Sequence, residues 1–258
     1  MQRTARSVVA SALLGVVFLT GCAVAPTTTV SRPDGTDVTV NWEDYPASAG
    51  MNAEEILAAP REKEVEAIGT ALFAALRESL DEQFELRWTE SGEAGWYPEH
   101  GNGYGGESVL ITYNSSSSET DSAPSSPSDW RSIVERVSTV TEANGLGTVV
   151  LDHEMPPSEA DEVAWQRDLH NRFGTDDPDR YWIWTGTAYR NAQWLAVSIV
   201  DVERDPTGKA TDDLGDEPGQ YIAFSYGATV IPDSERDAFV RALEPFRELE
   251  RPPASHSD

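Results

Sequence analysis

The stretch YWIWTGTAYRNAQWLAVSIVDV, residues 181–202, decides the fold class of this 258-residue chain. Its two halves, residues 181–189 and 194–202, are rich in aromatic and β-branched residues, which is typical of strands. Asn191 lies between the halves and indicates a tight turn that joins them as a hairpin. A third run of the same kind covers residues 221–230, so the sequence predicts a β-rich C-terminal half.

The first of these strands carries two tryptophans on one face. Because successive side chains point to opposite faces of a strand, Trp182 and Trp184 share one face while Tyr181 and Ile183 share the other. We expect most of the eight tryptophans to lie in the core, and a pair left exposed would form a recognition platform.

Helical periodicity is found on both sides of the β-rich segments. Apolar residues recur at steps of three and four over residues 61–84, which predicts a long amphipathic helix. Similar patterns predict further helices within residues 52–58, 126–145 and 162–173, and one that opens at Pro232-Asp233. Pro245 is expected to kink or shorten the last helix.

Shorter apolar runs predict strands at residues 84–89, 108–113 and 148–151. We expect the first two to form a hairpin whose long connection contains residues 95–107. The serine- and proline-rich residues 114–127 are expected to form a mobile, exposed loop. Because neighbouring strands form hairpins and do not alternate strictly with helices, the sequence predicts an α+β fold. We expect a single two-layer sandwich with a mainly antiparallel sheet and helices packed on one face.

The first 22 residues have the pattern of a targeting signal. Arg3 and Arg6 precede an apolar run, residues 8–19, that is short for a membrane-spanning helix, and Leu19-Thr20-Gly21-Cys22 follows. This lipobox predicts a lipoprotein signal peptide over residues 1–21 and lipid attached to Cys22, the only cysteine. An ordinary secretory leader with a chance cysteine is the alternative. We therefore expect a lipid-anchored protein on the extracytoplasmic face of the cell membrane.

Composition divides the rest of the chain into three parts. Residues 22–50 are rich in Thr, Pro, Ser, Asp and Gly and are expected to form a flexible tether, with pairing of Val38-Thr39-Val40 as an edge strand as the alternative. Residues 51–250 are expected to form the α+β domain, and residues 251–258 a disordered tail.

Acidic residues outnumber basic ones, and the formal net charge is −26 at pH 7. Such a surface repels nucleic acid, so we expect no nucleic-acid partner; it favours cationic partners, divalent ions or simple solubility. Only Lys63 and Lys209 are lysines, and arginine supplies the other 17 basic residues. This bias is typical of high-GC genomes and indicates an actinobacterial source.

The stretch GWYPEHGNGYGGE, residues 95–107, is the first candidate for a ligand site. A phosphate-binding loop opens a helix, whereas a strand is expected after this stretch, so a nucleotide site is disfavoured. Three interpretations stay open: a structural hairpin connection, acid–base chemistry by Glu99, His100 and Glu107, and recognition of a ligand by flat aromatic rings. The candidate ligand-binding residues are Trp96, Tyr97, Glu99, His100, Asn102, Tyr104 and Glu107.

The sequence contains no recognised metal or nucleophile motif. Its four histidines lack metal-ligand spacing, and His153 is expected to be a hydrogen-bonded turn residue. Neither G-x-S-x-G nor S-x-x-K is present. Aspartates within residues 176–179 and 205–217 offer oxygen ligands to Ca²⁺ without EF-hand spacing, so a calcium clip in the second loop stays an alternative to a solvated loop. We expect no cofactor and no catalytic metal.

Together with the leader, Gly95-Trp96 and Gly101-Asn102-Gly103-Tyr104 resemble the LppA-like lipoproteins of mycobacteria and related actinobacteria. The resemblance implies a cell-envelope location and assigns no catalytic residues. We therefore expect a non-catalytic module that binds a protein or an envelope glycan and meets the membrane through the lipid on Cys22. The alternatives are a cell-wall-directed hydrolase with Glu99 and Glu107 as acid and base, and a calcium-dependent adhesion module.

Overall fold

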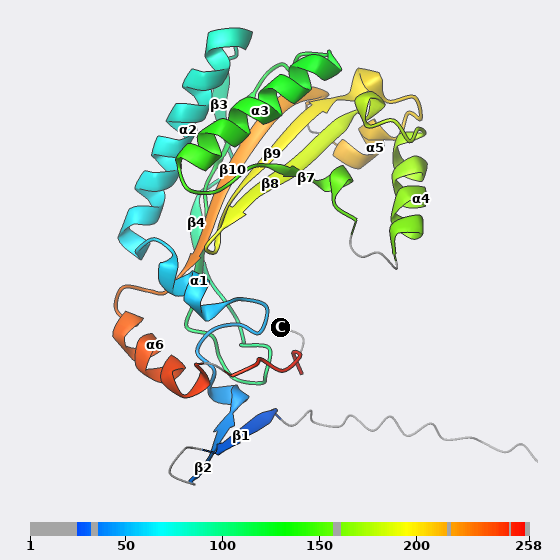
Figure 1. Cartoon of the computed structure of the whole chain (residues 1–258). Helices are drawn as coiled ribbons and strands as arrows, with labels where there is room; N and C mark the ends of the chain where they lie inside the picture. The colour runs from blue at the N-terminus through cyan, green and yellow to red at the C-terminus, as the bar shows by residue number, and fades with distance from the viewer. Residues whose placement is uncertain (1–24, 32–35, 157–160, 216–217, 248, 256–258) are drawn as a thin grey trace, which may run out of the picture.

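One large sheet forms the centre of the protein (Figure 1). The computed structural model describes residues 25–31, 36–156, 161–215, 218–247 and 249–255. The strands of this sheet are β3 (Trp88–Ser91), β4 (Gly95–Pro98), β5 (Ile111–Asn114), β6 (Ser117–Thr120), β7 (Val150–Leu151), β8 (Ile183–Arg190), β9 (Gln193–Asp201) and β10 (Gln220–Val230). Their order is β3-β6-β10-β9-β8-β7, and β5 pairs with both β10 and β4. The pairings between these strands are antiparallel, which confirms the predicted α+β fold with a mainly antiparallel sheet.

The stretch that decides the fold forms the β8–β9 hairpin. Arg190 pairs with Gln193, so the turn contains only Asn191 and Ala192, which take positive φ angles of 50° and 59°. Two left-handed residues in a two-residue loop match the twist of the strands that they join. The third predicted strand, β10, pairs along the length of β9.

Strands β5 and β6 pair with β10 one after the other along its second edge. Between them, the Ser115 amide donates to the Tyr226 carbonyl at 2.9 Å, so the edge stays hydrogen-bonded. The mobile loop predicted at residues 114–127 is therefore wrong in its first half. The reason is that backbone groups form the pairing, so a run of serine and threonine can still form a strand between β3 and β10.

The hairpin predicted between residues 84–89 and 108–113 does not form. Helix α2 continues to Phe84, and Glu85 ends it in the left-handed conformation with a φ of 51°. Strand β3 then pairs with β6, whereas β4, which lies inside the expected connection, pairs with β5.

Two helices, α2 (Glu62–Phe84) and α3 (Pro127–Ala143), lie side by side on one face of the sheet (Figure 1). Their apolar stripes and the facing strand residues form the main core, as their periodicity predicts. Helix α2 approaches β10 closely at Gly69, where a Cβ atom would lie 2.7 Å from the Tyr226 ring. Space alone therefore favours glycine at this point of the helix.

Helix α4 (Glu162–Phe173) lies beyond the β8–β7 end of the sheet, away from α2 (Figure 1). Phe173 stacks on Tyr181 with ring centroids 3.9 Å apart. Ile183 and Leu169 line a common cavity, so α4 lies near the face of β8 that α3 does not cover. A short helix, α5 (Ala210–Leu214), follows in the acidic loop between β9 and β10.

A second, smaller core lies at the opposite end of the protein from α4 and α5 (Figure 1). Its elements are β1 (Thr27–Ser31), β2 (Asp37–Asn41), η1 (Trp42–Asp44), α1 (Ala53–Ala58), α6 (Arg236–Leu243) and η5 (Glu244–Phe246). Trp42, Tyr45, Tyr104 and Phe246 pack ring against ring, with centroids 5.1–6.1 Å apart. Helix α6 ends just before Pro245, as predicted.

The flexible tether expected at residues 22–50 is wrong for the described residues 27–31 and 37–47. Strands β1 and β2 form an antiparallel hairpin, and Trp42 is fully buried. The segment is polar apart from a few large rings, and these rings find their partners in distant parts of the chain. Short-range composition therefore hid the burial.

Residues 251–255 of the expected disordered tail are also packed. The Tyr104 hydroxyl donates to the Pro252 carbonyl at 2.9 Å, and the Ser255 amide donates to the Gly103 carbonyl at 2.9 Å. The leader, Cys22 and residues 256–258 lie outside the described residues. Within the described ranges, no helix is both long enough and apolar enough to cross a membrane.

Candidate functional site

Residues 95–107 are called here the glycine-rich loop. Asn102, at the centre of this loop, holds the second core together. Its Nδ2 donates to the carbonyls of Trp42, Glu43 and Tyr45 at 3.1, 2.9 and 2.9 Å. Its Oδ1 accepts from the amides of Tyr104 and Gly106 at 2.9 and 3.0 Å. A fully buried amide with five partners has no capacity left for a ligand.

Asn102 and Tyr104 are candidate ligand-binding residues in the sequence, and in the fold both side chains are fully buried. Gly106 belongs to the same packed contact with residues 42–45, because a Cβ atom there would lie 1.8 Å from the Glu43 carbonyl oxygen. This part of the loop is a structural connection.

Trp96 and Tyr97 lie on β4, outside this buried centre. The Trp96 ring packs on Tyr113 with centroids 5.1 Å apart, and its Nε1 donates to Glu66 at 3.2 Å. The Tyr97 side chain is exposed, at 53% of its surface. Of the predicted aromatic residues, Tyr97 is therefore the most accessible to a partner.

The three residues considered for acid–base chemistry do not form a unit. Glu99 accepts a hydrogen bond from the Thr112 hydroxyl, while His100 and Glu107 are exposed. Among the described residues, Glu99, His100 and Glu107 make no hydrogen bond or ion pair with one another. The geometry of a catalytic acid–base pair is not assembled here.

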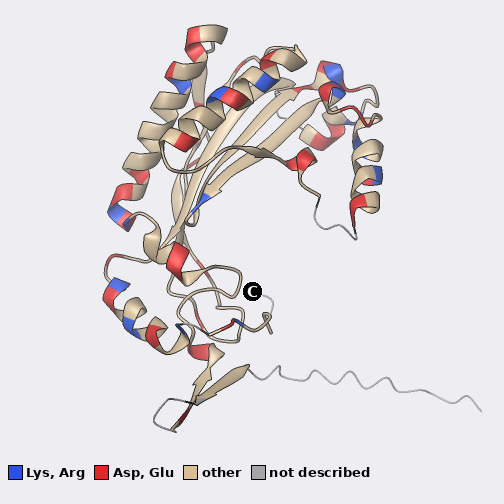
Figure 2. Cartoon of the chain, viewed as in Figure 1, with Lys and Arg blue, Asp and Glu red and all other residues tan. Residues whose placement is uncertain are grey.

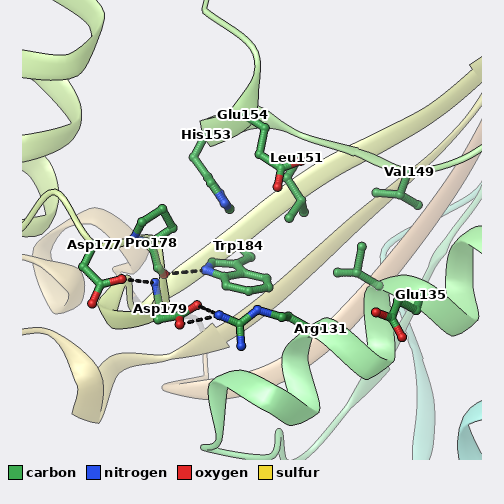
Figure 3. Close-up of a pocket in the computed structure, with 11 residues that line it drawn as sticks. Arg131, Glu135, Val149, Leu151, His153, Glu154, Asp177, Pro178, Asp179 and Trp184 are labelled. Atoms are coloured by element: carbon green, nitrogen blue, oxygen red, sulfur yellow. Dashed lines mark hydrogen bonds and ion pairs between the residues drawn. The ribbon is translucent and has the colours of Figure 1, made fainter.

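A pocket of about 480 Å³ lies between helix α3 and the segments that flank β8 (Figure 3). Its walls come from α3 at residues 131–135, from β7 and η2 (Asp152–Glu154) at residues 149–154, from η3 (Pro178–Arg180) and Asp177, and from Trp184 of β8. We call it the His153 pocket. In sheet register, Trp184 is level with Ile222 of β10, whereas the glycine-rich loop leaves the sheet near Val230. The separation along β10 is roughly 25 Å at about 3.3 Å per residue.

The floor of the His153 pocket is apolar and fixed in place. Trp184 is 4% exposed and packs edge-on against Trp130 of α3, with centroids 5.5 Å apart. Its Nε1 donates to the Pro178 carbonyl at 2.9 Å, which ties the ring to η3. Val149 and Leu151 complete the floor. Trp182 is also buried, so the exposed tryptophan platform considered for this strand does not exist.

His153 stands over the floor with its ring against two aromatic residues. Its centroid lies 5.6 Å from Tyr181 and 5.3 Å from Trp184. Burial lowers the pKa of His153, although the charges of Glu154 and Asp152 oppose this effect, so the ring is neutral at pH 7. Its nitrogens hydrogen-bond to none of the described residues, so a hydrogen-bonded turn histidine stays a prediction. Figure 3 shows the ring turned toward the pocket.

One basic side chain on the rim is already paired. Arg131 of α3 forms a two-pronged ion pair with the Asp179 carboxylate (Figure 3). Behind it, Arg204 donates to the Asp179 carbonyl and lies 3.9 Å above the Trp130 ring. The Arg131 guanidinium is therefore already paired. Nη1 of Arg204 is buried without a hydrogen-bond partner among the described residues, but Arg204 does not line the pocket.

The other rim charges are carboxylates. Asp177 accepts from the Asp179 amide at 3.1 Å, whereas the side chains of Glu135 and Glu154 form no hydrogen bond or ion pair with the described residues. Figure 2 shows the same pattern at larger scale, with acidic residues on helices and loops and few charges on the strands. The pocket thus combines an apolar floor with a net negative rim.

The acidic loop proposed as a calcium clip is ordered by its own turns where it is described. Asp205 accepts from the amides of Thr207 and Ala210, both at 2.8 Å, and from the Thr207 hydroxyl. These bonds lower the pKa of Asp205 against the opposing effect of burial. The described residues contain no group of three or more His, Cys, Asp or Glu side chains placed to hold a metal ion.

Sequence reasoning did not find the His153 pocket. Its walls come from four segments of the chain. The lining residues noted in the sequence were given other roles: Asp177 and Asp179 as possible calcium ligands, His153 as a turn residue and Trp184 as one of a tryptophan pair. The available signal was the concentration of acidic residues on either side of two aromatic strands, which does not by itself reveal a cavity.

No protein-family model, curated protein or solved structure matches this chain in the comparisons made. The function is therefore inferred from the sequence and the geometry alone.

Proposed function

We propose that this protein is a lipid-anchored, non-catalytic binding module of the cell envelope, similar to the LppA-like lipoproteins, and that it binds its ligand in the His153 pocket. The observation that carries the proposal is the pocket itself: an apolar floor beside Glu135, Glu154 and His153, whose side chains form no hydrogen bond or ion pair with the described residues. Small-molecule and side-chain sites commonly have this composition.

The pocket replaces the glycine-rich loop as the preferred ligand site. The side-chain amide of Asn102 is hydrogen-bonded within the second core, and the ring of Tyr104 is buried there. A partner protein or envelope glycan could still touch Tyr97, but an isolated exposed ring is common on protein surfaces.

The hydrolase alternative is less well supported. Glu99 is held by Thr112, and Thr112 in turn hydrogen-bonds to Thr229 at 2.7 Å, so the carboxylate belongs to a structural chain of hydroxyl groups. General acid–base catalysis needs two groups that converge on one substrate. The described geometry offers no such pair at this loop.

The anchor follows from Leu19-Thr20-Gly21-Cys22 in the sequence. Cys22 precedes Thr27, the first residue of β1, by five residues, which span at most about 17 Å when fully extended. A lipid on Cys22 would therefore hold the second core near the membrane. The His153 pocket, at the other end of the sheet, would then be presented away from it.

Photo-crosslinking in intact cells tests the proposal. A benzophenone amino acid at position 135, on the rim of the pocket, is expected to capture a specific envelope component. The same probe at position 142, one more exposed site on α3, serves as the control. Capture that is equal at both positions, or absent at position 135, would refute the pocket as the ligand site.

A further inference from the structure

We infer that the His153 pocket takes an alkylammonium group, with the alkyl stem on its apolar floor and the ammonium at its acidic rim. The inference rests on the proposed function, in which this pocket is the ligand site, and it specifies the chemistry of the ligand.

The floor suits an alkyl stem. Val134, Val149 and Leu151 present aliphatic surface, and Trp184 presents an aromatic ring fixed by its bond to Pro178. The volume of about 480 Å³ lies within the range of roughly 300–1,000 Å³ that is usual for ligand pockets. A stem laid here removes apolar surface from water on both partners.

The rim selects the sign of the ligand's charge. Four carboxylates face one guanidinium around the pocket, and that guanidinium, Arg131, is bound to Asp179. An anionic ligand would meet the unpaired charges of Glu135 and Glu154 at close range. A neutral apolar ligand would reduce the hydration of these charges without replacing it. A cation avoids both costs.

The number of hydrogen-bond donors favours an ammonium. Because the half-buried ring of His153 lies against Tyr181 and Trp184 and is neutral near pH 7, one of its nitrogens is an acceptor. An ammonium carries three donors and no acceptor, so carboxylates and a neutral imidazole nitrogen are all suitable partners. A flexible stem lets the head group choose among them.

Calorimetric titration of the full-length lipidated protein in detergent tests the inference. The probes are Nα-acetyl-lysine-N-methylamide and its neutral isostere, Nα-acetyl-norleucine-N-methylamide. We expect the lysine probe to bind at least about tenfold more tightly, since two exposed carboxylates each contribute modestly. Equal affinity of the two probes, or no binding of the lysine probe, would overturn the inference.

A matched pair of variants places the effect in the pocket. Glu135→Gln combined with Glu154→Gln should lower the affinity for the lysine probe about tenfold and leave the norleucine probe unchanged. Glu142→Gln, on the exposed side of the same helix, should change neither. Loss of the lysine preference in Glu142→Gln, or its retention in the double variant, would contradict the assignment.

A third probe distinguishes the two sources of this chemistry. Pentylammonium binding as tightly as the lysine probe would indicate a free amine, whereas weaker binding would indicate a lysine-type side chain on a peptide. The in-cell crosslink separates this inference from the proposed function. Specific capture at position 135 with no lysine preference would refute only the alkylammonium ligand, and absence of capture would refute the ligand site itself.

Discussion

Arg131 of α3 and Asp179 of η3 form an ion pair across the rim of the His153 pocket, and both oxygens of the carboxylate accept from one guanidinium nitrogen. The pair joins a helix to a turn that lies 48 residues away in the sequence. It also pairs the one guanidinium among the described lining residues, so the unpaired charges of the lining are carboxylates.

Arg131→Ala should strengthen binding of the lysine probe. Removal of the guanidinium leaves the Asp179 charge unpaired, so we expect the affinity to rise about twofold to threefold. The free energy of unfolding should fall by less than about 1 kcal/mol, because both side chains are substantially exposed. Arg167→Ala on α4 makes the same charge change outside the pocket and is the control. A weaker affinity in Arg131→Ala would show that the arginine contacts the ligand directly.

Asn102→Ala should destabilise the second core strongly. The substitution removes the side-chain donor of the buried Tyr45 carbonyl and the acceptor of the Tyr104 and Gly106 amides, and we expect a loss of about 3 kcal/mol in the free energy of unfolding. Urea denaturation of the full-length protein measures the loss. Asn114→Ala, at an exposed asparagine, should cost less than about 0.5 kcal/mol. Equal effects of the two substitutions would refute the structural role of Asn102.

His153 should make stability fall at acidic pH. Burial lowers its pKa in the folded state below the unfolded value of about 6.5. The contribution is therefore complete above pH 6.5 and is lost as the pH falls below it, because the unfolded state binds the proton more readily. Between pH 7 and pH 5, His153→Gln should lose less stability than the unsubstituted protein. An NMR titration midpoint for His153 at or above 6.5 would contradict this expectation.

Cys22→Ser should release the protein from the membrane fraction. The prediction follows from the lipobox, since acyl chains on one sulfur are the anchor that we propose. Metabolic labelling with radioactive palmitate should mark the unsubstituted protein and not the variant. Palmitate incorporation into Cys22→Ser, or an unchanged membrane fraction, would refute the proposed anchor.

The sequence predicts the helices and the central strands well because these elements satisfy their own periodicity. The long run from Val65 to Leu80 defines α2, and the turn at Asn191 defines the β8–β9 hairpin. Strand β6 was missed because its residues are polar, so it shows no apolar alternation, and its place in the sheet depends on backbone pairing with β3 and β10.

The functional residues were harder to predict because burial depends on distant segments. Asn102 and Tyr104 look like ligand residues beside glycines, yet residues 42–45 and Pro252 surround them in the fold. The His153 pocket likewise exists only after α3, η3 and β8 meet. Local sequence patterns carry no information about contacts between segments that are far apart in the chain.

The most direct test of the central claim compares crosslinking from the pocket with crosslinking from the glycine-rich loop. A benzophenone amino acid is placed at position 135 in one strain and at the exposed position 97 in another, and the captured envelope components are identified by mass spectrometry. We expect a specific adduct from position 135 that the lysine probe competes away, and only background from position 97. A specific adduct from position 97 alone would contradict the account and return the ligand site to the loop.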